Sequence, residues 1–160
     1  MWSRWAILCS VLPPFLLLED SYTEVQLMTA MLKRIGLVNP VRVIGTVADA
    51  QRHLEQSVPD RLPVVVFIGV QARGAHGLDL LAWMRQQSPE LGQIATIALV
   101  NGADDAAMVR AVDLGVPIVE RPLDMRALVT AMRGLGLAEK AKIDRTTLMV
   151  QVELWPPAIE

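Results

Sequence analysis

The sequence predicts an α/β fold: a doubly wound, five-stranded parallel sheet covered by helices on both faces, giving a three-layer (βα)5 sandwich. Short apolar runs alternate with helical patterns, and the connections between them are short. The clearest run, residues 63–68, is β-branched and uncharged, which is typical of a strand buried on both faces. The expected strands are residues 15–18, 41–44, 63–68, 94–100 and 116–119.

The expected helices have recognisable boundaries. Ser21 stands three residues before Glu24, a capping-box spacing, and Gly36 ends the helix that follows. Pro59 ends the second helix and Gly115 ends the fourth. The fifth helix carries an amphipathic stripe, so one side of it should face the sheet. The helical patterns cover residues 21–35, 47–54, 77–87, 104–114 and 125–135.

Composition excludes several classes of protein. The chain has 160 residues, of which 52% are hydrophobic and 20% charged, and its formal net charge is −2. It is too apolar for a disordered chain, and too close to neutrality for a dedicated nucleic-acid binder. A single cysteine rules out a disulfide framework and a cysteine-based zinc site, so a reduced, cytoplasmic protein is the simplest interpretation.

The two ends of the chain are expected to lie outside the folded domain. The apolar run of residues 1–18 is interrupted by Pro13 and Pro14, and it is too short and broken to span a membrane. We interpret its first part as an extension, and an export signal or a wrongly chosen start codon stays open. Three interpretations of residues 146–155 stay open: an added edge strand, a segment that binds a partner, or an appendage without function. The expected organisation is an extension at 1–13, a domain at 14–137 and a tail at 138–160.

Functional residues of such a sheet lie where the strands end, because the carboxyl ends of parallel strands share one edge. A glycine-rich loop at residues 69–77 has the spacing of a phosphate-binding loop. Ala75 and His76 stand where that loop needs Lys and Ser or Thr, so a loop without this function is favoured. The loops of interest start at Glu19, Gly69, Val100 and Glu120.

Four segments of the chain carry a resemblance to a known family. They are residues 16–21 (LLLEDS), 32–54, 77–85 (GLDLLAWMR) and 111–123, which contains AVDLG and Arg121-Pro122-Leu123. In this order they resemble the receiver domain of bacterial two-component response regulators, the CheY-like family, with a flavodoxin-like sheet. The resemblance covers about residues 14–137. Residues 32–54 are similar to the corresponding segment of small single-domain regulators of this family.

The resemblance implies a phosphoryl-transfer site that is degenerate in this chain. In the family, a histidine kinase supplies a phosphoryl group to an Asp after the third strand, with Mg²⁺, a hydroxyl and a Lys assisting. The acceptor position matches Gly69 and the hydroxyl position matches Val100, and neither side chain can do this chemistry. Residues 64–78 contain no Asp or Glu that could replace the acceptor. The Lys position matches Arg121, and the aromatic switch position matches Ile118.

The acidic pair of the family matches Glu19 and Asp20. Three interpretations of these acids stay open: a weak residual Mg²⁺ site, solvated carboxylates, or a pair with Arg121. No cofactor is expected to be required.

The resemblance therefore implies a pseudo-receiver of phosphorelay signal transduction that has no enzymatic activity and acts through protein–protein interaction. Its expected partner is a histidine kinase, an effector or a second copy in a homodimer, and neither nucleic acid nor a membrane is expected. Two alternatives stay open: a conventional regulator with an unrecognised acceptor, and binding of a small anion at the strand ends. The expected partner face, on the last two helices, carries Met108, Arg110, Met125, Arg126, Val129 and Arg133.

Overall fold

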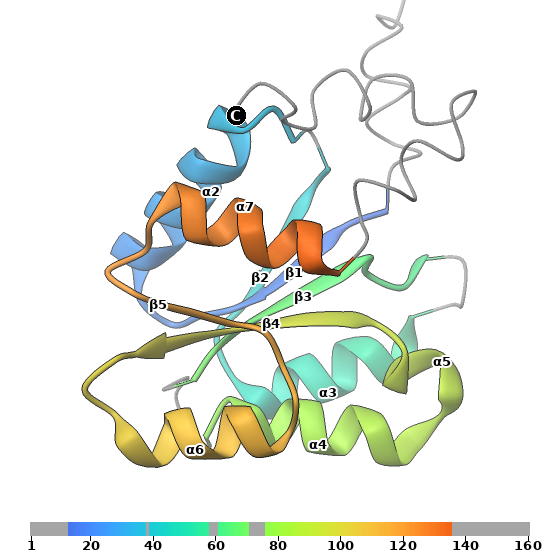
Figure 1. The fold of residues 1–160 in the computed structure, drawn as a ribbon. Helices are drawn as coiled ribbons and strands as arrows, with labels where there is room; N and C mark the ends of the chain where they lie inside the picture. Colours follow the sequence, from blue (N-terminus) through green and yellow to red (C-terminus); the bar gives the residue numbers. More distant parts are fainter. Residues whose placement is uncertain (1–12, 38, 58–60, 71–75, 136–160) are drawn as a thin grey trace, which may run out of the picture.

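A computed structural model describes residues 13–37, 39–57, 61–70 and 76–135 of the chain. The described residues form a parallel five-stranded sheet in the order β2–β1–β3–β4–β5 (Figure 1). The strand order reverses beside β1, which confirms the predicted doubly wound sheet. The elements are β1 (Phe15–Leu18), α2 (Tyr22–Arg34), β2 (Val41–Ile44), α3 (Val47–Gln56), β3 (Val65–Gly69), α4 (Leu78–Gln87), α5 (Pro89–Gly92), β4 (Ala95–Asn101), α6 (Asp105–Asp113), β5 (Ile118–Arg121) and α7 (Met125–Gly134).

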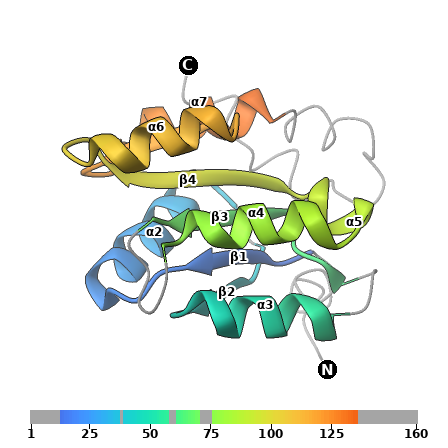
Figure 2. The same ribbon diagram turned by 90° about the horizontal axis from the view of Figure 1, so that it is seen from below.

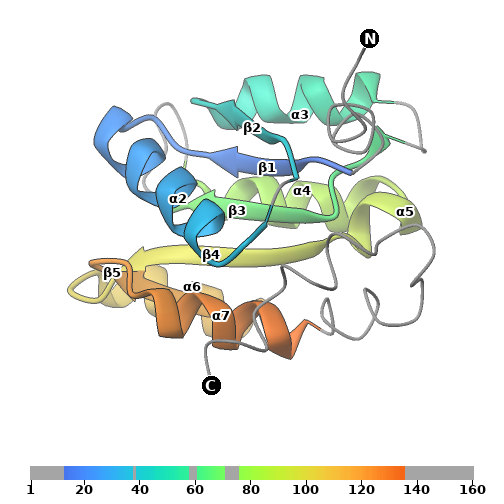
Figure 3. The same cartoon turned by 90° about the horizontal axis from the view of Figure 1, so that it is seen from above.

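Helices cover both faces of the sheet, as the sequence predicts. Figure 1 shows α2 and α7 on one face and α3, α4 and α6 on the other. Figure 2 looks at the face with α3, α4 and α6, and Figure 3 looks at the face with α2 and α7. Along β1, Phe15 and Leu17 pack in the cluster with α2 and α7, whereas Leu16 and Leu18 pack in the cluster with α3, α4 and α6. Each of the four is at most 3% exposed. Burial on both faces explains why this strand is entirely apolar.

Local signals set the ends of the helices. The Ser21 hydroxyl accepts a hydrogen bond from the Glu24 N–H at 3.4 Å, but the Ser21 N–H donates to Glu19 instead of Glu24, so the predicted capping box is half formed. Gly36 and Gly115 have φ values of 89° and 67°, and they end α2 and α6 as predicted. Side-chain caps also begin α3, α5, α6 and α7, at Thr46, Ser88, Asp104 and Asp124, whereas α4 begins after Gly77 without one.

The fifth strand lies two residues further along the chain than the predicted residues 116–119. Pro117 has no N–H to give to the ladder, and its carbonyl instead accepts a hydrogen bond from the Ala98 N–H at 2.9 Å. β5 also ends in two charged residues, which made this segment look like a loop. An edge strand tolerates them because one side of it is open to solvent. The short helix α5 is a further element that the sequence patterns did not indicate.

Most of the predicted extension and tail falls outside the described residues, including residues 146–155. Pro13 is the first described residue, and its carbonyl accepts a hydrogen bond from the Asn39 side-chain amide at 2.8 Å. Among the described helices, none is long and apolar enough to cross a lipid bilayer.

Candidate functional site

All five parallel strands have their carboxyl ends at one edge of the sheet, and four of them carry predicted site residues. The residues predicted there are Glu19 and Asp20 after β1, Gly69 at the end of β3, Val100 in β4 and Arg121 at the end of β5. We call these five residues the strand-end site. The structure brings Glu19, Gly69 and Arg121 into contact, while Val100 and Asp20 contribute less.

The Glu19 carboxylate is buried and fully engaged, with 4% of its side chain exposed. Its Oε1 accepts hydrogen bonds from the N–H groups of Asp20 at 3.0 Å and Ser21 at 3.1 Å. Its Oε2 accepts a hydrogen bond from Arg121 Nη2 within an ion pair. The adjacent N-terminus of α2 also favours a negative charge at this place. Of the three interpretations left open by the sequence, the pair with Arg121 is therefore confirmed for Glu19.

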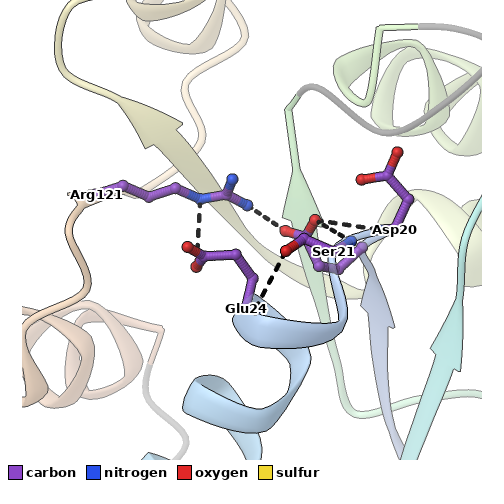
Figure 4. Close-up of polar contacts among 5 residues, drawn as sticks. Asp20, Ser21, Glu24 and Arg121 are labelled. Carbon is purple, nitrogen blue, oxygen red and sulfur yellow. Dashed lines mark hydrogen bonds and ion pairs between the residues drawn. The ribbon is translucent and has the colours of Figure 1, made fainter.

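Arg121 reaches this pair from another part of the sheet. β3 and β4 separate β5 from β1, so the arginine side chain extends across the ends of two strands. Its side chain is 20% exposed, and its Nε lies 4.0 Å from Glu24 Oε2. Figure 4 shows the guanidinium pointing toward Glu24 and the start of α2, with the Asp20 carboxylate turned away from it. One guanidinium thus joins the end of β5 to two carboxylates at the start of α2.

Gly69 lies directly beside this ion pair. A Cβ atom placed on Gly69 would lie 2.7 Å from Glu19 Oε2, 2.7 Å from the Leu18 carbonyl oxygen and 3.1 Å from Arg121 Nη2. These separations are shorter than van der Waals contacts, and the Leu18 oxygen belongs to the backbone of a paired strand. The ion pair and the end of β1 therefore occupy the space that a side chain at position 69 would need.

The other predicted site residues lie apart from this contact. Val100 is fully buried and belongs to the cluster under α3, α4 and α6, so the position is part of the core. Ile118, the predicted switch position, is half-buried at the start of β5. Asp20 is exposed. Within the described ranges, no group of three acidic, histidine or cysteine side chains is arranged to hold a metal ion.

The structure corrects the predicted partner face at Val129 and shows how Arg110 is held. Val129 is 4% exposed and packs with α2 and the sheet, because it lies on the buried stripe of α7. Arg110 is held on the flank of α6 that faces α4, since its Nη2 lies 2.6 Å from Asp79 Oδ1 and its Nη1 lies 3.3 Å from His76 Nδ1. Of the remaining predicted positions, Met108 and Met125 are half-buried, and Arg126 and Arg133 are exposed.

Two exposed valines on α6 were missed by the sequence analysis. Val109 and Val112 are 60% and 66% exposed. The buried stripe of α6 contains Ala107 and Ala111. A rotation of about 100° per residue places both valines away from that stripe, and it places Val112 about 200° from Arg110. A helical projection of residues 105–113 would therefore have indicated that the two valines are exposed.

Comparisons with solved structures identify the fold. The bacteriophytochrome response regulator RtBRR matches with a TM-score of 0.68 and 28% identity, over 79% of this chain and 79% of that chain. The bacteriophytochrome response regulator AtBRR matches with a TM-score of 0.68 and 26% identity, over 79% of this chain and 94% of that chain. The signal receiver domain of a histidine kinase from Syntrophus aciditrophicus matches with a TM-score of 0.66 and 22% identity, over 79% of this chain and 92% of that chain. The chain thus has the receiver-domain fold of response regulators.

No protein-family model matches the chain, and no curated protein sequence matches it. The likeness to receiver domains therefore comes from the three-dimensional structure together with the motifs in the sequence.

Gly69→Ala should lower the free energy of unfolding by about 1–3 kcal/mol, because the added methyl group is forced against Glu19 and the Leu18 carbonyl. Gly134→Ala is the matched control. A Cβ on Gly134 meets nothing within 4 Å at the end of α7, so this change should be neutral or stabilise by up to about 1 kcal/mol. Urea unfolding of both variants measures the difference, and equal effects would contradict the close approach at Gly69.

Glu19→Gln and Arg121→Gln, made singly and together, should show a coupling free energy of about 1–2 kcal/mol in urea unfolding, because each residue loses its buried partner. The exposed pair Asp49–Arg52 is the control, since its side chains are 55% and 65% exposed. Its coupling should stay near about 0.3–0.5 kcal/mol. Additive effects of the Glu19 and Arg121 changes would show that the ion pair contributes nothing.

Proposed function

We propose that this protein is a pseudo-receiver: a receiver-like module of two-component signalling that does not accept a phosphoryl group, has no enzymatic activity and acts through contacts with proteins. The receiver-domain fold and its likeness to two response regulators support the signalling class. The residues of the strand-end site are what argue against phosphoryl acceptance by this protein.

Gly69 is the observation that carries this proposal. It stands at the end of β3, at the position of the phosphoryl acceptor, and it has no side chain. The adjacent space is filled by the Glu19–Arg121 ion pair. A phosphoryl group would find neither a nucleophile nor room at this place.

The residues of the strand-end site do not fit a Mg²⁺ ion of the receiver type. Magnesium prefers carboxylate oxygens in near-octahedral geometry. Both oxygens of Glu19 already accept hydrogen bonds, and Gly69 offers no carboxylate. The guanidinium of Arg121 supplies a positive charge beside Glu19, so we propose that the protein works without a metal.

The two alternative functions have less support at this edge of the sheet. The nearest acid after β3 among the described residues is Asp79, which lies in α4 and pairs with Arg110 at 2.6 Å. It is thus a poor replacement for the acceptor. A small anion would meet Glu19 and Glu24, which already share Arg121, and the negative charge there would repel it.

We assign the contact surface to the outer side of α6, β5 and α7, named here the α6–β5–α7 face. Val109 and Val112 expose apolar surface at this place. The exposed acids lie on α6, on β5 and at the N-cap of α7, whereas the exposed arginines lie further along α7. A two-fold axis would set the acids of one copy against the arginines of another, so a second copy is the partner we propose. The exposed charged residues are Asp105, Asp113, Glu120, Asp124, Arg126 and Arg133.

Incubation with acetyl phosphate and Mg²⁺ should leave the intact mass of the protein unchanged, because Gly69 provides no acceptor. A receiver domain with an intact acceptor Asp, treated in parallel, is the positive control, and EDTA removes the metal in a second sample. A metal-dependent gain of one phosphoryl group would contradict the proposal and return the protein to the class of phosphorylated regulators.

Sedimentation velocity should show a dimer that Val112→Asp dissociates. A charge buried without a partner costs about 3 kcal/mol, which corresponds to roughly a 100-fold rise in the dissociation constant. Val43→Asp is the control, because Val43 is also exposed, at 45%, but lies on β2 at the opposite edge of the sheet. A wild-type monomer at all concentrations, or an equal effect of the two changes, would contradict self-association through this face.

A further inference from the structure

We infer that the Glu19–Arg121 ion pair closes the acceptor site, so that restoring an Asp at position 69 does not by itself restore phosphoryl acceptance. The side chains of Arg121 and Glu19 together fill the space beside position 69. This inference rests on the proposed function, since it explains how the site is kept inactive beyond the loss of one side chain.

Steric crowding opposes a side chain at position 69. Its Cβ would lie 2.7 Å from Glu19 Oε2, 2.7 Å from the Leu18 carbonyl oxygen and 3.1 Å from Arg121 Nη2. Of these three contacts, the two with the ion pair are the ones that side-chain substitutions can remove. An Asp would then extend further, into the volume of the two paired groups. The carboxylate would also add a negative charge next to Glu19, whose own charge is already balanced by Arg121.

Glu19 is held in place by hydrogen bonds. Its Oε1 accepts from the N–H groups of Asp20 and Ser21, at 3.0 and 3.1 Å. These donors lie in the turn that leads into α2, so a rotation of the carboxylate would break both hydrogen bonds. Arg121 is fixed in turn between Glu19 and Glu24, which come from one corner of the fold.

The side chain of Arg121 crosses the ends of two strands. From the end of β5 the guanidinium must pass β4 and β3 to reach the residue after β1. Gly69 ends β3 on this path, and the lack of a side chain there leaves room for the guanidinium. The glycine and the ion pair are therefore two parts of one arrangement, and changing one of them alone produces a conflict.

The inference is tested by comparing Gly69→Asp with the triple variant Glu19→Asp/Gly69→Asp/Arg121→Lys. The triple variant shortens the carboxylate and replaces the planar guanidinium with a compact ammonium. Each protein is incubated with acetyl phosphate and Mg²⁺, with and without EDTA, and its intact mass is measured. In a positive reaction, the carboxylate introduced at position 69 forms a bond to phosphorus, the P–O bond to the acetyl group breaks, and acetate leaves.

We expect a metal-dependent gain of one phosphoryl group in the triple variant and no gain in Gly69→Asp. An equal gain in both variants would overturn the inference and leave the proposed function intact, because the wild type would still be unreactive. No gain in either folded variant would also overturn it, since the ion pair would then not be the obstacle. A gain in the wild type would overturn the proposed function itself.

A stability measurement covers the case in which Gly69→Asp does not fold. The change Glu19→Asp is introduced into the wild type and into Gly69→Ala, and the melting temperatures of the four proteins are compared. If the carboxylate of Glu19 occupies the space beside position 69, its shortening should lower the melting temperature of the wild type and recover part of the loss caused by Gly69→Ala. Additive losses in the double variant would overturn the inference.

Discussion

The ion pair between Glu19 and Arg121 determines how the carboxyl edge of the sheet is arranged. A buried carboxylate is stable only if donors surround it, and Glu19 receives two backbone N–H groups and one guanidinium. The guanidinium comes from β5, which is not a neighbour of β1, so the arginine side chain needs free space at the carboxyl end of β3. Gly69 provides that space. The position of the start of α2 relative to the end of β5 thus depends on a residue that has no side chain.

The remainder of the fold does not need phosphoryl chemistry. Two apolar clusters, one on each face of the sheet, contain the side chains of β1, β3 and β4 and the inner stripes of the helices. Their burial supplies most of the stability, independently of any ligand at the strand ends. Val100 is part of this core, where burial of a valine side chain contributes about 1.5–3 kcal/mol.

Much of the fold was predictable because its signals are local. Apolar runs identified the strands, and Gly36 and Gly115 marked helix ends, since only a glycine tolerates positive φ there at little cost. The Glu19–Arg121 pair was foreseen only as one of three alternatives, because the choice depends on a contact between residues 102 positions apart. The placement of Val129 on the partner face was wrong, and the pairing of Arg110 with Asp79 was not foreseen, since both depend on how the helices pack.

Arg121 links the two regions on which the proposed function depends. It is the last residue of β5, so it belongs to the edge strand of the α6–β5–α7 face, and its side chain ends at Glu19 on the far side of β3. A partner that bound this face and favoured one position of β5 would also favour one geometry of the ion pair, because coupling between two sites is reciprocal. Under the proposed function, binding at the face would therefore act on the ion pair through Arg121, which belongs to both regions.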